Sequence, residues 1–389
     1  MNRNIFGILE KIKYVKILLV EPFFTGSHQL WASGYEQFSK HELRILSLPG
    51  RHWKWRMYAG AVELAKQFLA LKNYSPDLIL ATDMLDLTTF LALTRSKTAT
   101  IPTAIYFHEN QITYPWSATD PDIALKRDNQ YGFINYTSAL AADRLFFNSP
   151  YHQQSFLGAL PSFLAQFPDY KGIEHLAGIE KKSASLPLGV NLSILKNHIT
   201  SEKNKIPLLL WNHRWEYDKN PVPFFEALFQ LKAEKISFQV AILGTSYHKR
   251  PAIFKEAKTK LAKEIIQFGA VKTLAEYADW LWRADLLPVT NNQDFFGQSV
   301  VEAIYTNCFP ILPYRLAYPM HIPEQEHAKH FYYKTTDFYP LLKNAIKNIE
   351  KIRRESYQHF VSQYDWCTLA PKYDEEMKRV IDNQIANSK

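Results

Sequence analysis

The strongest constraint on the fold is an alternation of short apolar runs with segments of helical periodicity, and this alternation occurs twice along the chain. In the first half the strand-length runs cover residues 15–20, 43–48, 78–81, 103–107 and 144–148. In the second half they cover residues 208–211, 238–243, 265–268, 286–289 and 309–312. Such alternation predicts an α/β protein with parallel sheets.

The length of 389 residues favours two domains. We expect two doubly wound, Rossmann-like domains with a cleft between them. The segment LPLGVN at 186–191 and the polar stretch after it indicate where the first domain ends. The predicted boundaries are an N-terminal domain at 1–190, a linker at 191–205, a C-terminal domain at 206–365, and a last helix at 366–389 that packs back on the N-terminal domain.

Composition excludes several classes of protein. Hydrophobic residues make up 47% of the chain and charged residues 22%, which is typical of a globular protein and not of a disordered one. No apolar run approaches the about 20 residues of a membrane span, and residues 1–15 lack the features of a secretory signal. Two cysteines cannot form a disulfide framework, so we expect a cytoplasmic protein.

The net charge favours an anionic partner. Lys and Arg number 46 against 38 Asp and Glu, which gives +8 at neutral pH. Nucleic acid, sugar nucleotides and anionic lipid surfaces all remain open on this ground.

The richest motif in the chain, DFFGQSVVE at 294–302, directly follows the run at 286–289. Gly297 allows close backbone approach, and the free amides of Gln298 and Ser299 at a helix start favour a pyrophosphate. Glu302, one turn further, is placed to bind a ribose, and Asp294 faces the part of the ligand beyond the phosphates. The alternative is an acidic surface loop followed by a helix cap.

Two cations follow the run at 208–211. Arg214 and Lys219 can converge on a diphosphate leaving group at this strand end. A small-residue turn with Gly26 follows the first run of the chain and also fits a phosphate. A solvated charged turn is the alternative for the two cations.

His108, in the sequence FHEN, ends the run at 103–107. A strand end in a parallel sheet points into the ligand crevice, so the imidazole is a candidate catalytic group. A structural histidine is the alternative. A zinc helix of the HExxH type requires a second histidine at position 112, which is Ile112, and we therefore predict no metal.

Cations alternate with indoles in the segment RHWKWR at 51–56. Indoles stack on bases or sugars while cations neutralise phosphates, which makes the segment a candidate acceptor surface. The alternative is an amphipathic surface turn. The candidate residues are Arg51, Trp53, Lys54, Trp55 and Arg56.

Taken together, these motifs resemble the retaining glycosyltransferases of the GT-B fold, family 4, and more closely the family of tRNA-queuosine alpha-mannosyltransferases. The resembling stretches span most of residues 16–320. They are VEPFFTGSHQLWASG, PGRHWKWRM, YFHENQITYP, FNSPYHQQSFL, WNHRWEYDKNP, and FFGQSVVEAIYTNCFPILP with LAYP after it.

The resemblance implies a GDP-mannose donor held by the C-terminal domain, and transfer with retention of configuration and without a metal or other cofactor. It implies that Arg214 and Lys219 neutralise the diphosphate, that Glu302 binds the ribose, and that Asp294 contacts the sugar. His108 would lie near the reacting sugar. The chain departs from the usual pattern at one position, since Asp294 stands where the family 4 motif usually has Glu.

The resemblance also implies an acceptor, the cyclopentenediol of queuosine in the anticodon of tRNA-Asp. The cluster at 51–56 and Asn110 are the candidate acceptor contacts. Two alternatives are kept: a family 4 glycosyltransferase acting on a lipid or cell-envelope acceptor, and a non-catalytic RNA-binding protein on a GT-B scaffold. No integral membrane segment is expected for the first choice.

Overall fold

The computed structural model describes residues 14–117, 120–125, 127–199, 203–245 and 251–387. It divides the chain into two compact units. Unit 1 comprises Met1–Gly189 together with Trp366–Lys389, and unit 2 comprises Val190–Asp365. The chain therefore passes from one unit to the other twice. None of the helices among the described residues is both long and apolar enough to cross a bilayer.

Unit 1 is built on a parallel sheet of six strands in the order β2-β1-β3-β4-β5-β6. The five runs predicted from the sequence all form strands, and β6 is an addition that its short polar sequence SAS does not reveal. The strands are β1 (Lys16–Phe24), β2 (Glu42–Pro49), β3 (Leu78–Thr82), β4 (Thr103–Phe107), β5 (Arg144–Phe147) and β6 (Ser183–Ser185).

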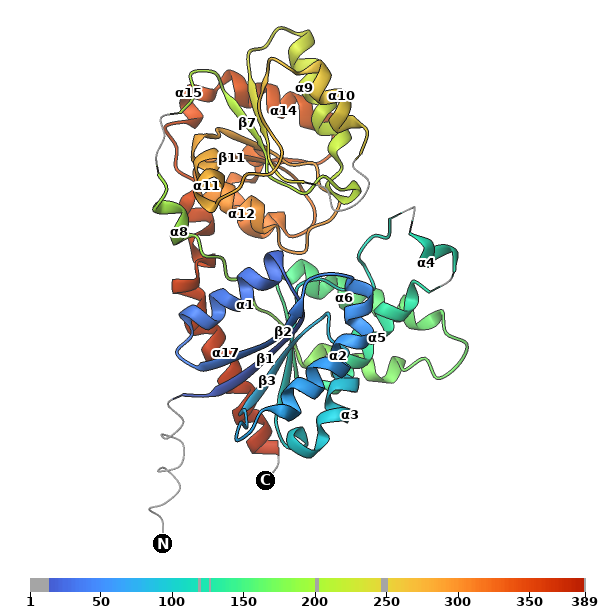
Figure 1. Ribbon diagram of the computed structural model, residues 1–389. Coiled ribbons are helices and arrows are strands. Elements are labelled where there is room, and N and C mark those ends of the chain that lie inside the picture. The colour runs from blue at the N-terminus through green and yellow to red at the C-terminus, as the bar shows by residue number, and fades with distance from the viewer. Residues whose placement is uncertain (1–13, 118–119, 126, 200–202, 246–250, 388–389) are drawn as a thin grey trace. The chain divides into compact units, whose positions relative to one another are not determined.

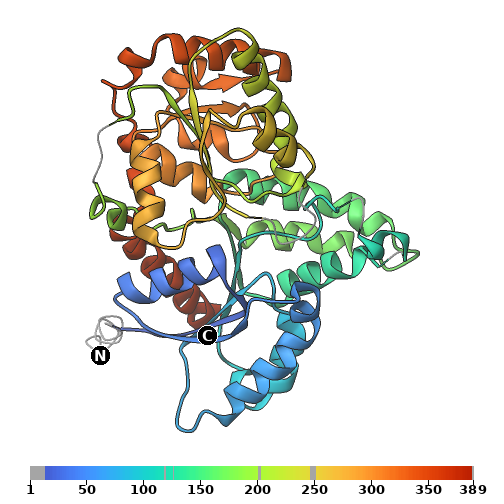
Figure 2. The same ribbon diagram turned by 45° about the horizontal axis from the view of Figure 1, so that its top comes forward.

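Helices cover both faces of this sheet (Figures 1 and 2). Helices α1 and α17 contact each other on one face, and α2, α3 and α5 pack together on the other. The helices of the unit are α1 (Gly26–Phe38), α2 (Trp53–Ala70), α3 (Leu87–Thr98), α4 (Pro121–Ala124), α5 (Asn129–Ala141), α6 (Pro150–Ala165), α7 (Leu176–Lys181) and α17 (Trp366–Asn387).

Helix α17 begins at Trp366, where the predicted last helix begins, and it contains Pro371. A proline close to a helix start removes a single backbone hydrogen bond there, so the helix persists.

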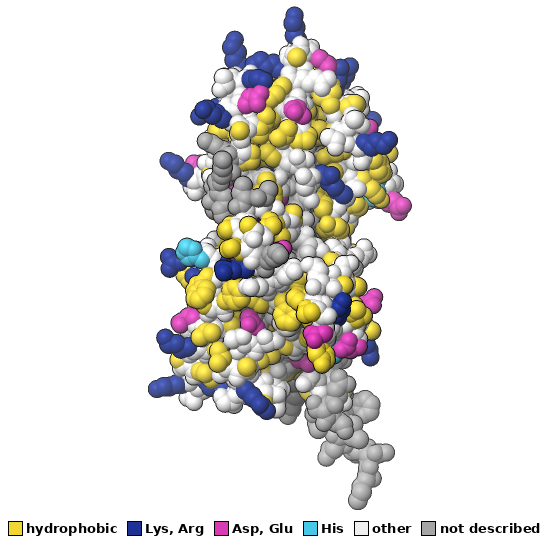
Figure 3. Space-filling view, turned by 90° about the vertical axis from the view of Figure 1, so that its right-hand side faces the viewer, with side chains coloured by type: hydrophobic (Ala, Val, Ile, Leu, Met, Phe, Trp, Pro, Cys, Tyr) yellow, Lys and Arg dark blue, Asp and Glu magenta, His cyan; other side chains and the backbone are white. Residues whose placement is uncertain are grey.

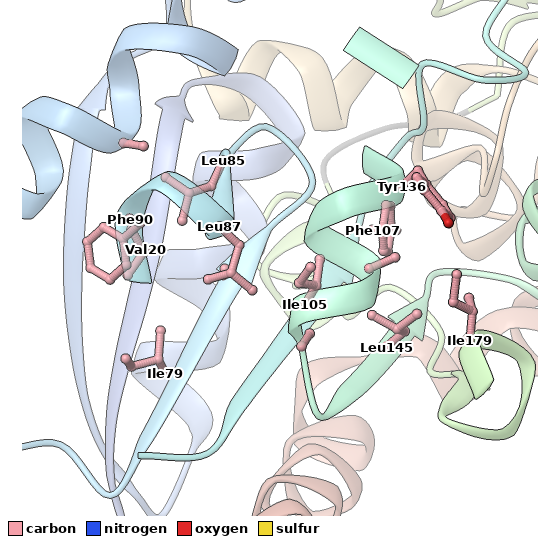
Figure 4. Packing of buried hydrophobic residues seen from close by; sticks show 14 of the residues in the cluster. Val20, Ile79, Leu85, Leu87, Phe90, Ile105, Phe107, Tyr136, Leu145 and Ile179 are labelled. Atoms are coloured by element: carbon pink, nitrogen blue, oxygen red, sulfur yellow. The ribbon is translucent and has the colours of Figure 1, made fainter. Parts of the chain in front are cut away.

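The main core of unit 1 lies between the sheet and the α2, α3, α5 and α6 helices. Alternate residues of the central strands point into it, and Figure 4 shows how they meet side chains of the helices. Fully buried members shown there are Val20, Ile79, Ile105, Phe90 and Phe107. Because successive strand residues face opposite sides, Tyr106 belongs to the other face, where its ring stacks on Trp31 of α1 at 4.5 Å.

Unit 2 repeats this architecture with the strand order β12-β11-β10-β7-β8-β9. Its strands are β7 (Leu208–Trp211), β8 (Gln239–Ile242), β9 (Ile265–Phe268), β10 (Leu286–Pro288), β11 (Phe309–Pro313) and β12 (Phe331–Tyr332). The two-residue β12 is too short to be predicted. The helices are α8 (Ser193–Lys196), α9 (Pro221–Ala233), α10 (Ile253–Lys260), α11 (Leu274–Arg283), α12 (Gln298–Tyr305), α13 (His327–His330), α14 (Thr335–Lys347), α15 (Ile349–Ile352) and α16 (Gln358–Val361).

In both units the chain order reverses beside the first strand. The switch lies between β1 and β3 in unit 1 and between β7 and β10 in unit 2. Ligands of open α/β sheets bind outside the carboxyl ends of the strands at such a point. The loops after these strands therefore define where each unit's functional residues are to be sought.

Candidate functional site

Lys219 lies at the centre of the charged cluster of unit 2. The loop after β7 ends in a short 3₁₀ turn (Tyr217–Lys219) that places the side chain beneath the loop after β10. Its ammonium nitrogen donates to the Gln293 carbonyl oxygen at 2.7 Å and to Asp294 Oδ1 at 2.8 Å. Asp218 Oδ2 lies 3.0 Å away. Burial lowers the pKa of Lys219, but the carboxylates of Asp294 and Asp218 raise it more, so the ammonium stays charged.

Arg214 reaches the same cluster from the other side of Asp218. Its guanidinium nitrogen lies 3.6 Å from Asp218 Oδ2, and its side chain is half exposed. The two predicted phosphate ligands are therefore brought together around one shared carboxylate. Asp218 was not among the predicted ligands, although it lies in the same motif as both cations.

Asp294 is held by donors from three elements. Lys219 binds Oδ1, while Asn291 Nδ2 donates to Oδ2 at 2.7 Å and the Tyr318 hydroxyl donates to the same oxygen. Burial raises the pKa of Asp294, but Lys219 and the hydrogen bonds outweigh it and hold the pKa at about 2. Asn291 and Tyr318 were not among the predicted site residues, although LAYP, which contains Tyr318, was among the resembling stretches.

The predicted helix after the FFG motif is α12. Gly297 precedes it with a φ of 87°, a left-handed conformation that glycine adopts readily. Glu302, one turn along, accepts hydrogen bonds from Gln298 Nε2 and from the Tyr277 hydroxyl of α11, both at 2.8 Å. Burial raises the pKa of Glu302, and these two donors oppose the shift. Tyr277 is a further partner that the sequence did not reveal.

Ser299 joins α12 to the loop after β7. Its hydroxyl lies 3.0 Å from His213 Nδ1, and its carbonyl oxygen accepts from Asn212 Nδ2 at 2.7 Å. Burial lowers the pKa of His213 to about 4, so this imidazole is neutral near pH 7. The loop after β7 and helix α12, which both carry predicted donor ligands, are thus hydrogen-bonded to each other within unit 2.

In unit 1, His108 lies where the strand-end argument placed it, directly after β4. Its amide donates to Asp83 Oδ1 of the neighbouring strand end at 2.7 Å. The ring packs on His28 at 4.2 Å and edge-on against Trp31 at 4.7 Å. Burial and the neighbouring charge of His28 lower the pKa of His108 well below its usual value, so this imidazole is neutral.

His28 and Glu21 form an ion pair next to His108. Glu21 belongs to β1, and His28 lies in the first turn of α1, after Gly26 with its φ of 52°. His28 Nδ1 lies 2.9 Å from Glu21 Oε2. Burial lowers the pKa of His28, but Glu21 and Asp83 outweigh it and raise the pKa to about 9.

Asp83 completes this group of buried polar side chains. Burial raises the pKa of its carboxyl to about 8, against the opposing effect of His28. Asp83 Oδ2 and His108 Nε2 have no hydrogen-bond partner among the residues that the structure describes. Both atoms are therefore able to take part in a further hydrogen bond.

Glu21, His28 and His108 each offer an atom that could ligate a metal, and these atoms lie within 4.8 Å of one another. The HExxH spacing could not have revealed this group, since its members come from β1, from α1 and from the position after β4. The direct contact between Glu21 and His28 already pairs two of the three side chains. The absence of a metal stays a prediction.

The candidate acceptor segment is less uniform than its sequence suggests. Trp55 is 62% exposed at the start of α2, whereas Trp53 packs on Tyr131 at 5.1 Å. Lys54 Nζ contacts Asp120 at 2.6 Å and Asp122 at 2.5 Å. Because two carboxylates balance its charge, Lys54 adds no positive charge to this surface.

The other candidate acceptor contacts differ in exposure. Arg51 is exposed, and Arg56 donates from Nε to the Pro49 carbonyl oxygen. Asn110 is buried, and its Oδ1 accepts from the amides of Ile112 and Thr113. Asn110 therefore holds the turn that follows His108.

The sequence of this chain matches known proteins over nearly its full length. A family model described as tRNA-queuosine alpha-mannosyltransferase N-terminal matches residues 16–190. A tRNA-queuosine alpha-mannosyltransferase of Drosophila melanogaster is 33% identical over 383 residues, which cover 95% of this chain and 98% of the fly protein.

Several solved structures share the fold of this chain. Sucrose-phosphate synthase of Thermosynechococcus elongatus superposes with a TM-score of 0.68 at 12% identity, covering 95% of this chain and all of the other. Anabaena HepE, solved in complex with UDP and glucose, gives 0.64 at 12% identity over 94% of this chain and all of its own. These likenesses confirm the predicted GT-B fold. The fly relative shows that the chain belongs to the tRNA-queuosine alpha-mannosyltransferase family.

Proposed function

We propose that this protein is a retaining glycosyltransferase that moves mannose from GDP-mannose to the cyclopentenediol of queuosine in tRNA. The observation that carries the proposal is the identity of 33% over nearly the whole chain with a protein of that name. The charged cluster of unit 2 supports it. Arg214, Lys219 and Asp294 are linked into one network of ion pairs through Asp218, and Glu302 is held by Tyr277 and Gln298.

The donor is proposed to bind unit 2. Arg214 and Lys219 stabilise the negative charge that develops on the diphosphate as the glycosidic bond breaks, which is the work a divalent cation does in other transferases. The amides at the start of α12 add to this field. Glu302, oriented by Tyr277 and Gln298, accepts hydrogen bonds from the ribose. We expect turnover to require no added metal.

Asp294 is proposed to contact the sugar and also to stabilise, by its charge, the transition state of sugar transfer. Both of its oxygens already accept hydrogen bonds, from Lys219 on one side and from Asn291 and Tyr318 on the other. A carboxylate this firmly held presents a fixed negative charge beside the reacting carbon. Such a charge stabilises the positive charge that a glycosyl group develops during transfer.

The acceptor is proposed to be a tRNA, and the charge of the protein suits this partner. The net charge is +8, and on the face in Figure 3 Lys and Arg stand apart from one another among acidic and apolar side chains. Dispersed cations favour several separate phosphate contacts. Each contact would make the affinity for tRNA fall with salt.

The proposal is tested by transfer of radiolabelled mannose from GDP-mannose to two tRNA preparations, one with queuosine and one without it. We expect label only in the queuosine-containing tRNA. The reaction is run with and without EDTA, and turnover should be the same in both.

Two controls bear on the alternatives. UDP-glucose replaces GDP-mannose in a parallel reaction to test the donor, and anionic lipid vesicles replace tRNA to test a membrane acceptor. Equal labelling of tRNA that lacks queuosine, or labelling of lipid alone, would overturn the proposed acceptor. Binding of tRNA without any transfer or donor hydrolysis would favour a non-catalytic RNA-binding protein.

A further inference from the structure

The ammonium of Lys219 has no hydrogen left for another acceptor. An ammonium carries three N–H donors. In this structure three oxygens lie within 3.0 Å of the nitrogen: the Gln293 carbonyl at 2.7 Å, Asp294 Oδ1 at 2.8 Å and Asp218 Oδ2 at 3.0 Å. The side chain is only 8% exposed. A phosphate oxygen can bind Lys219 at hydrogen-bond distance only if one of these oxygens gives way.

The three oxygens are held by different parts of the chain. The Gln293 oxygen belongs to the backbone, in a loop whose Thr290 and Asn291 carbonyls are held by Arg315. Asp294 is fixed through its second oxygen by Asn291 and Tyr318.

Asp218 makes the longest of the three contacts with Lys219. The same oxygen of Asp218 also lies 3.6 Å from the guanidinium of Arg214. When it leaves Lys219, its charge therefore still faces a cation. Of the two carboxylates on Lys219, Asp218 is therefore the one with a second lysine or arginine cation beside it.

We propose that Asp218 occupies the position on Lys219 that a phosphate oxygen of the sugar nucleotide takes, and that it withdraws from Lys219 when the nucleotide binds. This inference rests on the proposed function, since it assumes that Lys219 is a phosphate ligand. In the free protein Asp218 keeps the buried ammonium paired. In the complex it competes with the diphosphate, which weakens nucleotide binding and speeds release of the nucleoside diphosphate product.

The test compares a ligand with phosphates and one without. Calorimetry measures the dissociation constants of GDP and of guanosine for the unmodified protein, for Asp218→Asn and for Glu226→Gln. Glu226 is exposed on α9 of the same unit, so its substitution makes the same change in net charge away from the cluster. We expect Asp218→Asn to bind GDP about tenfold more tightly, because a neutral amide competes less well for an ammonium than a carboxylate does.

The measurement with guanosine distinguishes competition between Asp218 and the phosphates from a role of Asp218 in holding the loop. Guanosine has no phosphate, so its affinity should be the same in all three proteins, and GDP should bind Glu226→Gln as it binds the unmodified protein. Unchanged or weaker GDP binding by Asp218→Asn would overturn the inference. So would a parallel loss of GDP and guanosine binding, which marks Asp218 as support for the loop. Asp218→Ser is measured beside Asp218→Asn, because a serine side chain is too short to reach Lys219. Failure of both variants to fold would also count against the inference.

Failure of the proposed function gives a different result. If the unmodified protein binds UDP and not GDP, the proposed donor is wrong, and the same comparison with UDP and uridine still tests Asp218. Absence of mannosyl transfer likewise leaves the binding comparison intact. If GDP, UDP and ADP all fail to bind the unmodified protein, Lys219 is not a phosphate ligand and the inference is wrong.

Discussion

Buried charges at the functional positions of both units are paired with a partner from another segment of the chain. Lys219 follows β7 and meets Asp294 from the loop after β10, while His28 of α1 meets Glu21 of β1. Removing one member of a buried pair leaves an uncompensated charge, which costs far more than losing an exposed ion pair. Substitutions at these residues therefore affect folding as well as chemistry. An effect on turnover alone is expected only at positions where the substitution leaves stability unchanged.

Arg214 is such a position. Its side chain is half exposed and its ion pair with Asp218 is long, so Arg214→Ala should hardly change the melting temperature. If the guanidinium stabilises the leaving diphosphate, turnover with GDP-mannose should fall by about 10² to 10³. Lys232→Ala, which removes a cation from α9 of the same unit, serves as the control and should keep full turnover. Near-normal turnover of Arg214→Ala would exclude this residue from the mechanism.

The raised pKa of His28 predicts a pH dependence of stability. A histidine whose pKa is about 9 in the folded protein and about 6.5 in the unfolded chain stabilises the fold fully below pH 6.5. That contribution is lost as the pH rises through 9, and linkage puts it on the order of 3 kcal/mol. Asp83, whose pKa burial raises to about 8, acts in the same direction, because its protonated form is favoured in the fold.

We therefore expect the free energy of unfolding of the unmodified protein, measured by urea denaturation, to fall between pH 6.5 and pH 9. In His28→Gln the part of the decline that His28 contributes should be absent, while the part that Asp83 contributes should remain. Equal declines in the two proteins would show that His28 is not the titrating group.

At the scale of elements, the packing of α17 against the rest of unit 1 depends on two glycines that face one tryptophan. A Cβ atom on Gly34 of α1 would lie 2.0 Å from Trp366 Nε1, and one on Gly189 would lie 2.4 Å from the same indole. Trp366 is fully buried, and its ring packs on Tyr35 and Tyr373. The last helix thus belongs to the core of unit 1 although it is more than 170 residues away from Gly189 in sequence.

Gly34→Ala tests this packing. The added methyl group forces the indole or the helix to move, which should cost about 1 to 3 kcal/mol of stability. Gly158→Ala is a matched control, because Gly158 lies in α6 with no atom within 4 Å of the added Cβ. In a helix interior that change should stabilise by roughly 0.5 to 1 kcal/mol. Denaturation midpoints that move equally for the two variants would contradict the proposed contact.

The elements themselves were largely readable from the sequence, whereas their side-chain partners were not. Buried parallel strands are continuous apolar runs, and ten of the strands that the structure describes were predicted from such runs. The short β6 and β12 have no comparable apolar run. The motif around Gly297 gave the start of α12 through local chemistry alone.

By contrast, Tyr318 on Asp294, Tyr277 on Glu302 and His28 beside His108 join segments far apart in the chain or from different elements. Those contacts depend on strand order, which a single sequence does not encode locally. The same reason explains why Lys54, placed by pattern on a phosphate-binding surface, turns out to be paired with two carboxylates.

At the scale of the whole molecule, each unit has its own sheet and helices, and the proposed donor ligands all belong to unit 2 apart from Gly26. Chains of several domains commonly unfold in more than one step. A ligand that binds one folded unit stabilises that unit by mass action, by about 2.7 kcal/mol when its concentration is 100 times the dissociation constant.

Differential scanning calorimetry should therefore resolve two transitions, and GDP should raise the melting temperature of one while leaving the other nearly in place. The transition that does not respond to GDP should be the one that Gly34→Ala lowers, since Gly34 packs within unit 1. Arg214→Ala should reduce the GDP-dependent shift at the same nucleotide concentration without moving the second transition. A single transition that moves as a whole with GDP, or a shift by GDP of the transition that Gly34→Ala lowers, would show that the nucleotide is not held by unit 2 alone.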